Sequence, residues 1–296
     1  MGQQTRLEQR FYRNPSRSGL RVEVLSYADF RHRLTRPEFT RLHRLDFHHL
    51  TLVDQGEGTI TVDFVDHPCR PGTLLHVRPG QVQRLPVTSD GSPADLGGTL
   101  ILFTGDFLSR PPAASMPIDD PFGPTAWQLA GEDHNHFRRA FADLANGYAL
   151  PSGQAPDIVR ELLRHLLSAL LLRITLLPAP EDFPQPTGAT EEPYRLFRHE
   201  LERSFAVRHH AHDYATALGY SLKTLNRSCT RATGQTAKQL IDNRVSLEAK
   251  RLLAHTDLPV ASIGHRLGFT EPTNFGKFFT RATGQTPGAF RGERTV

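Results

Sequence analysis

The sequence predicts an α+β chain with three parts: a small N-terminal β-barrel, a helical segment, and an all-α C-terminal domain built from two similar units. Three observations lead to this prediction. Short runs of alternating apolar and polar residues fill residues 22–107, leucines recur at helical spacing in residues 155–177, and the heptapeptide TRATGQT occurs twice, at residues 230–236 and 280–286. At 296 residues the chain has room for about two domains of ordinary size.

The first part, residues 1–110, has the pattern of short strands joined by tight turns. In HHLTLVDQGEGTITVDFV, apolar and polar residues alternate on both sides of the turn-forming QGEG, which is the signal of a β-hairpin. Two Pro-Gly pairs bracket the next strand in CRPGTLLHVRPGQVQRL, and GGTLILF closes the set. Several short strands at this spacing are typical of a small sandwich or barrel.

The second part, residues 111–177, becomes helical from Gly131 onward. Apolar residues recur every four positions from Ile158 to Ile174, and a second row of leucines lies beside them. Such a wide stripe suits either an intramolecular core helix or the seam of a homodimer. We favour the homodimer, because so small a β-domain has little surface on which to bury all these leucines.

A proline-rich stretch and a change of charge separate the C-terminal part from the rest. PAPEDFPQPTGATEEP, residues 178–193, has five prolines and no periodicity, so we expect an extended linker. Residues 194–296 carry 16 Lys+Arg against 8 Asp+Glu, a balance of +8, whereas residues 1–193 carry 19 against 23, a balance of −4. This asymmetry predicts that the C-terminal part alone meets a polyanion.

The composition also argues against several classes of protein. No apolar run reaches the roughly 18 residues that span a bilayer, and the polar, arginine-rich N-terminus lacks the apolar core of a secretory signal. Cys69 and Cys229 are too few and too far apart for a disulfide framework or a cysteine-based zinc site. We expect a soluble cytoplasmic protein that does not bind a membrane.

The C-terminal part, residues 194–296, repeats one plan of two short helices joined by a tight turn. The copies align on Leu-Gly-aromatic, where Gly219 and Gly268 are suited to a left-handed helix end. In each copy TGQT ends the second helix at its glycine and begins the next helix at Thr236 or Thr286, and Thr236 has Gln239 three residues on, as in a capping box. This plan is a helix-turn-helix, found twice.

The segment between the two copies predicts a spacing suited to DNA. AKQLIDNRVSLEAKRLLAH has 19 residues, which as a helix span roughly 29 Å. One turn of B-DNA is about 34 Å. A rigid connector of that length would set two recognition helices into successive major grooves on one face of the duplex.

These residues resemble the DNA-binding domain of the AraC/XylS family of bacterial transcription regulators. IGHRLGFTEPTNFGKFFTRATGQTPGAFR follows the family pattern of Ile-Ala, Gly-Phe, Phe-x-x-x-Phe, Gly-x-Thr-Pro and a final aromatic-Arg. It departs from that pattern at Gly264, where the alanine is missing and we expect a looser helix. The hairpins of the front part resemble the cupin-like effector domain that precedes such domains, through Gly-x-Gly in the first hairpin and Pro-Gly on either side of the next strand.

The family resemblance implies a set of DNA contacts in the two recognition helices. Base edges would be contacted by Lys223, Thr224, Arg227, Thr273, Asn274 and Lys277. Lysine and arginine donate to guanine, asparagine pairs with adenine, and a threonine methyl can touch thymine. Arg231 and Arg281, at the helix ends, would contact phosphates. The residues expected to pack inward are Leu222, Leu225, Phe275, Phe278 and Phe279.

The front domain could serve as an effector-binding domain, as a purely structural domain, or as an enzyme. A small-molecule effector would lie in the barrel near His49, Thr51, Arg78 and Gln83; the alternative is a solid barrel that serves only dimerisation or partner contact. The rival is a metal-dependent cupin enzyme, which needs converging histidines and a carboxylate. His48 and His49 are adjacent and so point to opposite faces of a strand, and Gln83 stands where metal cupins have a histidine.

We therefore predict a sequence-specific DNA-binding transcription regulator, activator or repressor, and not an enzyme. Its expected partners are double-stranded DNA, RNA polymerase, a small-molecule effector and a second copy of the chain, with no metal or other cofactor. The alternative is a cupin-type small-molecule-binding or enzymatic domain with a non-specific nucleic-acid-binding tail.

Overall fold

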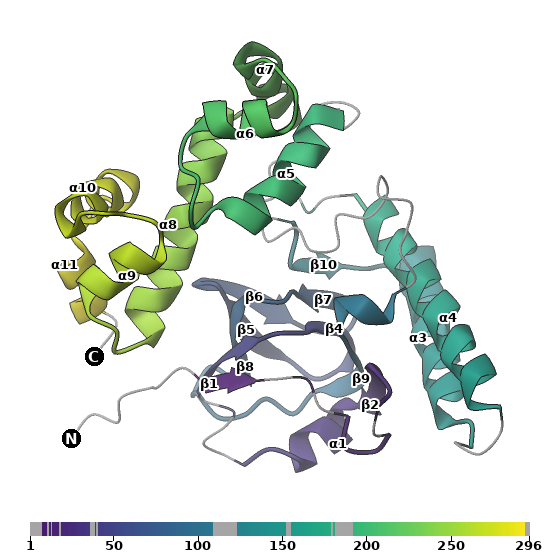
Figure 1. Cartoon of the computed structure of the whole chain (residues 1–296). Coiled ribbons are helices and arrows are strands. Elements are labelled where there is room, and N and C mark those ends of the chain that lie inside the picture. Colours follow the sequence, from purple (N-terminus) through teal and green to yellow (C-terminus); the bar gives the residue numbers. More distant parts are fainter. Residues whose placement is uncertain are drawn as a thin grey trace. The chain divides into compact units, whose positions relative to one another are not determined.

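The computed structural model describes residues 8–108, 123–151, 155–178, 180 and 192–293, apart from residues 11, 13, 18, 36–38 and 40. The described residues form two compact units, a front unit within residues 7–183 and a C-terminal unit within residues 184–296 (Figure 1). Most of the predicted linker, residues 178–193, lies outside the described residues; Glu192 and Pro193 are described and already belong to helix α5 (Glu192–Ser204). Within the described part of the chain, no helix is both long enough and apolar enough to cross a membrane.

The front unit contains two five-stranded sheets. In the first sheet the order is β1 (Glu8–Arg10), β3 (Leu42–Leu45), β8 (Val82–Val87), β5 (Gly58–Val62) and β6 (Val65–Cys69). In the second sheet the order is β10 (Ala126–Gln128), β7 (Thr73–Val77), β4 (His48–Gln55), β9 (Gly97–Phe103) and β2 (Val22–Ser26). Neighbouring strands are antiparallel except for the parallel pair β1 and β3.

Strand alternation divides the apolar residues of the front unit between two cores. Val53 and Leu75 of the second sheet meet Ile60 and Val62 of the first sheet in a core between the sheets. The intervening residues of the second sheet, such as Leu50, face outward and form a second core with the following helices. The period-two alternation of the sequence therefore predicts which residues of β4 lie on each face of the sheet.

Two helices cover the outer face of the second sheet. They are α3 (Gly131–Ala149) and α4 (Pro156–Leu176), which pack against each other and share the outer core (Figure 1). Three short elements were not predicted. Strand β10 lies within the segment expected to be helical, residues 111–177. A short helix, α1 (Tyr27–His32), and a 3-10 turn, η1 (Gly105–Phe107), lie within the β-rich part that precedes it. Each is six residues or shorter, too short for a periodic pattern to reveal.

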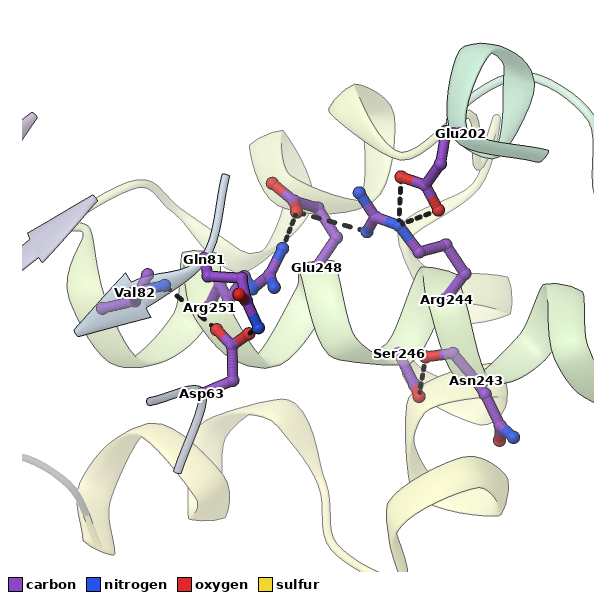
Figure 2. Close-up of polar contacts among 9 residues, drawn as sticks. All are labelled: Asp63, Gln81, Val82, Glu202, Asn243, Arg244, Ser246, Glu248 and Arg251. Atoms are coloured by element: carbon purple, nitrogen blue, oxygen red, sulfur yellow. Dashed lines mark hydrogen bonds and ion pairs between the residues drawn. The ribbon is translucent and has the colours of Figure 1, made fainter. Parts of the chain in front are cut away.

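The turn between β5 and β6 has an unusual backbone. Asp63 and Phe64 both have positive φ, 47° and 74°, in the region that favours glycine. The Asp63 carboxylate accepts hydrogen bonds from Gln81 Nε2 at 3.0 Å and from the backbone N–H of Val82 at 3.1 Å (Figure 2). These two bonds from the neighbouring strand stabilise the strained turn.

The C-terminal unit is entirely helical in its described part. Its helices are α5 (Glu192–Ser204), α6 (Ala211–Ala217), α7 (Leu222–Thr233), α8 (Ala237–His255), α9 (Val260–Arg266), α10 (Pro272–Thr283) and α11 (Pro287–Glu293). The long helix α8 packs against α6 and α7, and also against α9, α10 and α11 (Figure 1). The pairs α6–α7 and α9–α10 are the two predicted helix-turn-helix units, so the predicted fold class is confirmed.

Candidate nucleic-acid interface

The repeated TGQT ends one helix and begins another in both units, as predicted. Gly234 and Gly284 end α7 and α10 in the left-handed conformation, with φ of 74° and 79°. Each donates its backbone N–H to a carbonyl one turn back, that of Thr230 or Thr280, at 2.8 Å. The two recognition helices, each of 12 residues, therefore end in the same way.

The N-terminal caps of α8 and α11 are also those that the sequence predicts. Thr236 and Gln239 form a reciprocal capping box at the start of α8. The Thr286 hydroxyl accepts from the backbone N–H of Ala289 at 3.2 Å, and α11 begins at Pro287. The cap of α7 was not predicted: the Ser221 hydroxyl accepts from the backbone N–H of Thr224 at 3.1 Å.

The connector α8 spans the predicted 19 residues and is tied to α5 by a charge pair whose arginine is buried. Arg244 donates from Nε to both carboxylate oxygens of Glu202 at 3.0 Å (Figure 2). Its guanidinium carbon also lies 3.7 Å from the centre of the Phe205 ring. Glu248 pairs with both Arg244 and Arg251 at 3.4 Å. The Arg244–Glu202 pair joins α8 to α5, and the two contacts of Glu248 link successive turns of α8 itself.

The predicted DNA-contacting side chains lie largely on exposed faces of α7 and α10. The exposed members are Lys223, Arg227, Arg231, Thr273, Asn274, Lys277 and Arg281. Thr224 is half-buried, and its hydroxyl lies 2.9 Å from that of Ser221, so it also belongs to the cap. Because residues three and four apart share a helix face, each recognition helix presents one polar stripe.

Most of the residues predicted to pack inward do so, with one exception. Leu225, Phe275, Phe278 and Phe279 are buried. The prediction for Leu222 is wrong, because its side chain is 39% exposed. Leu222 is the first residue of α7, where the chain enters from the turn, and so it lies beyond the packed part of the helix.

Gly264 has a packing role that the sequence did not predict. A Cβ at this position would lie 3.0 Å from Cβ of Phe275 and 3.2 Å from its Cγ. Such contacts are tighter than most that real side chains make, so the glycine allows α9 to approach α10 closely. Phe275 is fully buried and packs against Phe269 and Phe279, with ring centres 5.4 and 6.0 Å apart.

The sequence did not predict a cleft between the two helix-turn-helix units. It has a volume of about 380 Å³ and is lined by residues of the loop before α6, of α8, of the turn before α10, and of α10. The His209 ring packs on Phe269 with ring centres 4.6 Å apart, and burial lowers its pKa. These residues are far apart in sequence, and the only feature of the sequence that points to such a cleft is the basic charge of the C-terminal part.

In the front unit, three of the four predicted effector residues come together between the sheets. Gln83 Nε2 of the first sheet lies 3.3 Å from His49 Nδ1 of the second, and His49 Nε2 lies 2.8 Å from the Thr51 hydroxyl. All three are buried, and burial lowers the pKa of His49 to about 4. The imidazole is therefore neutral at physiological pH.

Arg78, the fourth predicted effector residue, lies elsewhere. Its guanidinium donates to the backbone carbonyls of His76, Gly123 and Pro124 at 3.0–3.4 Å. It follows Val77, which pairs across the sheet with His49, and so points to the opposite face.

The adjacent histidine, His48, occupies that opposite face of β4, as the strand alternation predicts. Its Nδ1 lies 3.1 Å from Nε2 of His76, and its ring stacks on Phe103 with centres 4.5 Å apart. Among the described residues, no three histidine, cysteine, aspartate or glutamate side chains gather as ligands of a metal ion would.

Comparison with known proteins identifies both units. The AraC-like ligand binding domain family matches residues 30–197, more than half of the chain, and a helix-turn-helix domain family matches residues 214–293. The HTH-type transcriptional activator RhaS of Pectobacterium carotovorum subsp. carotovorum is 22% identical over 260 residues, covering 84% of this chain and 86% of RhaS. The activator of the same name from Salmonella schwarzengrund is 26% identical over 252 residues, covering 83% and 85%.

Solved structures give weaker matches. ToxT from Vibrio cholerae has a TM-score of 0.39 at 10% identity, covering 93% of this chain and 98% of ToxT. The C-terminal domain of AraT, a response regulator from Geobacillus stearothermophilus, has a TM-score of 0.35 at 24% identity, covering 37% of this chain and 91% of that domain. The match of the family to more than half of the chain, together with the paired helix-turn-helix units, shows that this chain belongs to the AraC family of DNA-binding transcription regulators, which are not enzymes.

Proposed function

We propose that this protein is a cytoplasmic, homodimeric transcription activator that binds specific DNA sites in response to a small molecule. The observation that carries the proposal is the pair of helix-turn-helix units with matching caps, joined by the 19-residue helix α8. At 1.5 Å per residue α8 is roughly 29 Å long, close to one turn of B-DNA. Activation through RNA polymerase is supported by relatives named transcriptional activators.

The proposed base contacts come from the polar stripes of α7 and α10. Lys223, Thr224 and Arg227 would contact bases in one major groove, and the second set, Thr273, Asn274 and Lys277, would contact bases in the next. Arg231 and Arg281 lie one turn nearer the helix ends, where they would contact phosphates and fix the orientation of each helix.

The test uses a duplex selected from random DNA by the full-length protein, together with single-base variants of that duplex. We expect Arg227→Ala and Lys277→Ala each to lose about 1–3 kcal/mol of discrimination at one base pair, because each removes a base contact. Arg231→Ala should instead weaken binding to all duplexes equally. The control is Arg203→Ala, an exposed arginine of α5 that belongs to neither recognition helix. Uniform weakening by Arg227→Ala and Lys277→Ala would show that these helices do not contact bases.

An exposed apolar row on α4 supports the homodimer. Ile158, Leu162, Leu172 and Leu176 are 71, 40, 44 and 83% exposed, although α4 buries its opposite face against α3 and the sheet. With the exposed His165 and Ala169, their spacing is 4, 3, 4, 3 and 4 residues, which is that of a coiled-coil seam. This row is not the one expected from Ile158 to Ile174, because the structure buries Ile174.

The order of residues in this row favours an antiparallel pair. If Ile158 packs against the partner's Leu176, then Leu162 meets the partner's Leu172, and the bulky His165 meets the partner's small Ala169. A parallel pair would instead place His165 against the partner's His165, and alanine against alanine, leaving one layer crowded and one layer empty.

Light scattering of the full-length protein tests the seam. Leu162→Glu should convert the dimer to a monomer because it buries a charge in the interface, whereas Arg160→Glu, on the exposed side of α4 outside the row, should leave the dimer intact. Orientation is tested by cysteines. The double variant Ile158→Cys with Leu176→Cys should form an intermolecular disulfide, and Ile158→Cys alone should not. A dimer that survives Leu162→Glu contradicts the seam.

The polar group between the sheets supports an effector site for an uncharged molecule. Gln83 Oε1 is buried without a hydrogen-bond partner in the described part of the chain, so it can accept from a ligand hydroxyl or amide. His49 and Thr51 add neutral donors and acceptors, and Arg78 would hold the wall of the site. Effector binding here would change how the front units hold the two DNA-binding units. Isothermal titration with Gln83→Leu, once an effector is known, should show weakened binding; unchanged affinity would place the effector elsewhere.

A further inference from the structure

The cleft between the helix-turn-helix units contains a cluster of charges with one acidic member. The Asp242 carboxylate of α8 pairs with Lys238, one turn earlier in the same helix, and lies 4.0 Å from the guanidinium of Arg281 in α10. Lys277 also lines the cleft, and so does His209. Three full positive charges and one negative charge therefore surround a space of about 380 Å³.

The lining of this cleft has free capacity for an oxyanion. His209 Nε2 is buried with no hydrogen-bond partner among the residues that the structure describes, and it can donate to an oxyanion when the imidazole is protonated. The Arg281 side chain is 71% exposed and that of Lys238 is 43% exposed, so both can turn toward a bound group. A phosphate needs several converging donors of this kind.

The cleft also lies beside the proposed base-contacting face of α10. Lys277 and Arg281 line both the cleft and the open face formed by Thr273, Gly276 and Thr280. DNA that passes from the major groove at α7 to the major groove at α10 presents the backbone of the minor groove between them. The cleft between the two units is where that backbone would pass.

We infer that this cleft binds a backbone phosphate of the DNA between the two major grooves, and that Asp242 occupies the phosphate's place in the free protein. The inference rests on the proposed DNA-binding function. In the free protein, the Asp242 carboxylate holds Lys238 and Arg281. On binding, a phosphate displaces the carboxylate and takes over both cations, so Asp242 lowers the affinity for every DNA sequence equally.

The test measures binding of the full-length protein to the selected duplex and to a scrambled duplex over a range of salt concentrations. Asp242→Asn should raise the affinity for both duplexes by about fivefold, the upper range for a surface ion pair, and leave their ratio unchanged. Lys238→Gln should lower both affinities and reduce the slope of log Kobs against log salt by about 0.9, the value for one phosphate. Asp257→Asn, which removes an exposed negative charge just beyond α8, is the matched control and should change affinity less than twofold.

The outcomes separate this inference from the proposed function. If Asp242→Asn lowers the affinity for DNA, or changes it no more than Asp257→Asn does, then a phosphate does not displace the Asp242 carboxylate. An unchanged salt slope in Lys238→Gln would show that no phosphate binds in the cleft. Failure of base recognition would appear instead as unchanged discrimination in Arg227→Ala, measured in the same series. Circular dichroism of each variant verifies that the fold is retained.

Discussion

Gly219 and Gly268 hold equivalent positions in the two helix-turn-helix units, yet alanine at each should have different consequences. Both have left-handed φ, 73° and 82°, so a side chain costs about 1–2 kcal/mol at either position. A Cβ at Gly219 would meet nothing within 4 Å. A Cβ at Gly268 would lie 2.3 Å from the backbone oxygen of Ala206.

The contact at Gly268 cannot be relieved by rotating a side chain, because the neighbouring atom belongs to the backbone. Ordinary contact begins at 3.4 Å, so the loop at Ala206 would have to move by about 1 Å. That loop continues to His209, whose ring packs on Phe269. Overpacking of this kind adds about 1–3 kcal/mol. We therefore expect Gly219→Ala to lower the free energy of unfolding by about 1–2 kcal/mol and Gly268→Ala by about 2–5 kcal/mol.

Urea unfolding of the full-length protein, followed by two probes, measures this difference. Far-ultraviolet circular dichroism reports the helices of both units, whereas the fluorescence of Trp127, the single tryptophan of the chain, reports the front unit alone. The part of the dichroism change that Trp127 does not follow therefore belongs to the C-terminal unit. Gly268→Ala should shift the dichroism transition to lower urea and leave the Trp127 transition in place. Equal shifts for Gly219→Ala and Gly268→Ala would refute the close approach of the loop to the second unit.

Three further predictions concern stability. Burial lowers the pKa of His49 from 6.5 to about 4, so its contribution to stability is complete above pH 6.5 and is lost as the pH falls from 6.5 toward 4, by about 3 kcal/mol. Urea unfolding followed by Trp127 fluorescence should show a smaller acid-induced loss for His49→Gln than for the parent, and an identical loss would contradict the shift. Arg244→Met should lower the free energy of unfolding by about 1–3 kcal/mol, because it takes the arginine away from Glu202 and leaves Glu248 with Arg251 alone. Arg203→Met, an exposed control on the neighbouring helix, should lower it by less than about 0.5 kcal/mol, and similar values for the two variants would show that these charge pairs do not hold the connector. Thr236→Ala should cost about 1 kcal/mol by removing the capping box, and an unchanged midpoint in circular dichroism would show that the box contributes nothing.

The ends of the C-terminal helices could be predicted because their signals act over a few residues. A glycine at the left-handed position ends a helix, and a threonine with a free backbone N–H three residues on begins one. Gly234 and Gly284 therefore predict where α7 and α10 end, and Thr236 predicts where α8 begins, without reference to any tertiary contact. Strand alternation likewise predicted that His48 and His49 lie on opposite faces of β4.

Features that depend on residues meeting from distant parts of the chain could not be predicted. The Arg244–Glu202 pair joins residues 42 positions apart, and no local pattern distinguishes it from solvated charges. The leucine pattern of α4 predicted a wide apolar stripe, but only packing against α3 and the sheet decides that Leu163 is buried while Leu162 is exposed. The DNA contacts themselves stay predictions, because the partner that defines them is another molecule.

The most direct test of the central claim is methylation interference with the full-length protein on a duplex that carries a single half-site. If α8 sets two recognition helices into successive major grooves, interference should appear as two clusters of guanines, about 10–10.5 base pairs apart on one face of the duplex. Arg227→Ala should weaken one cluster and Lys277→Ala the other. A single cluster, or two variants that weaken the same cluster, would contradict the claim.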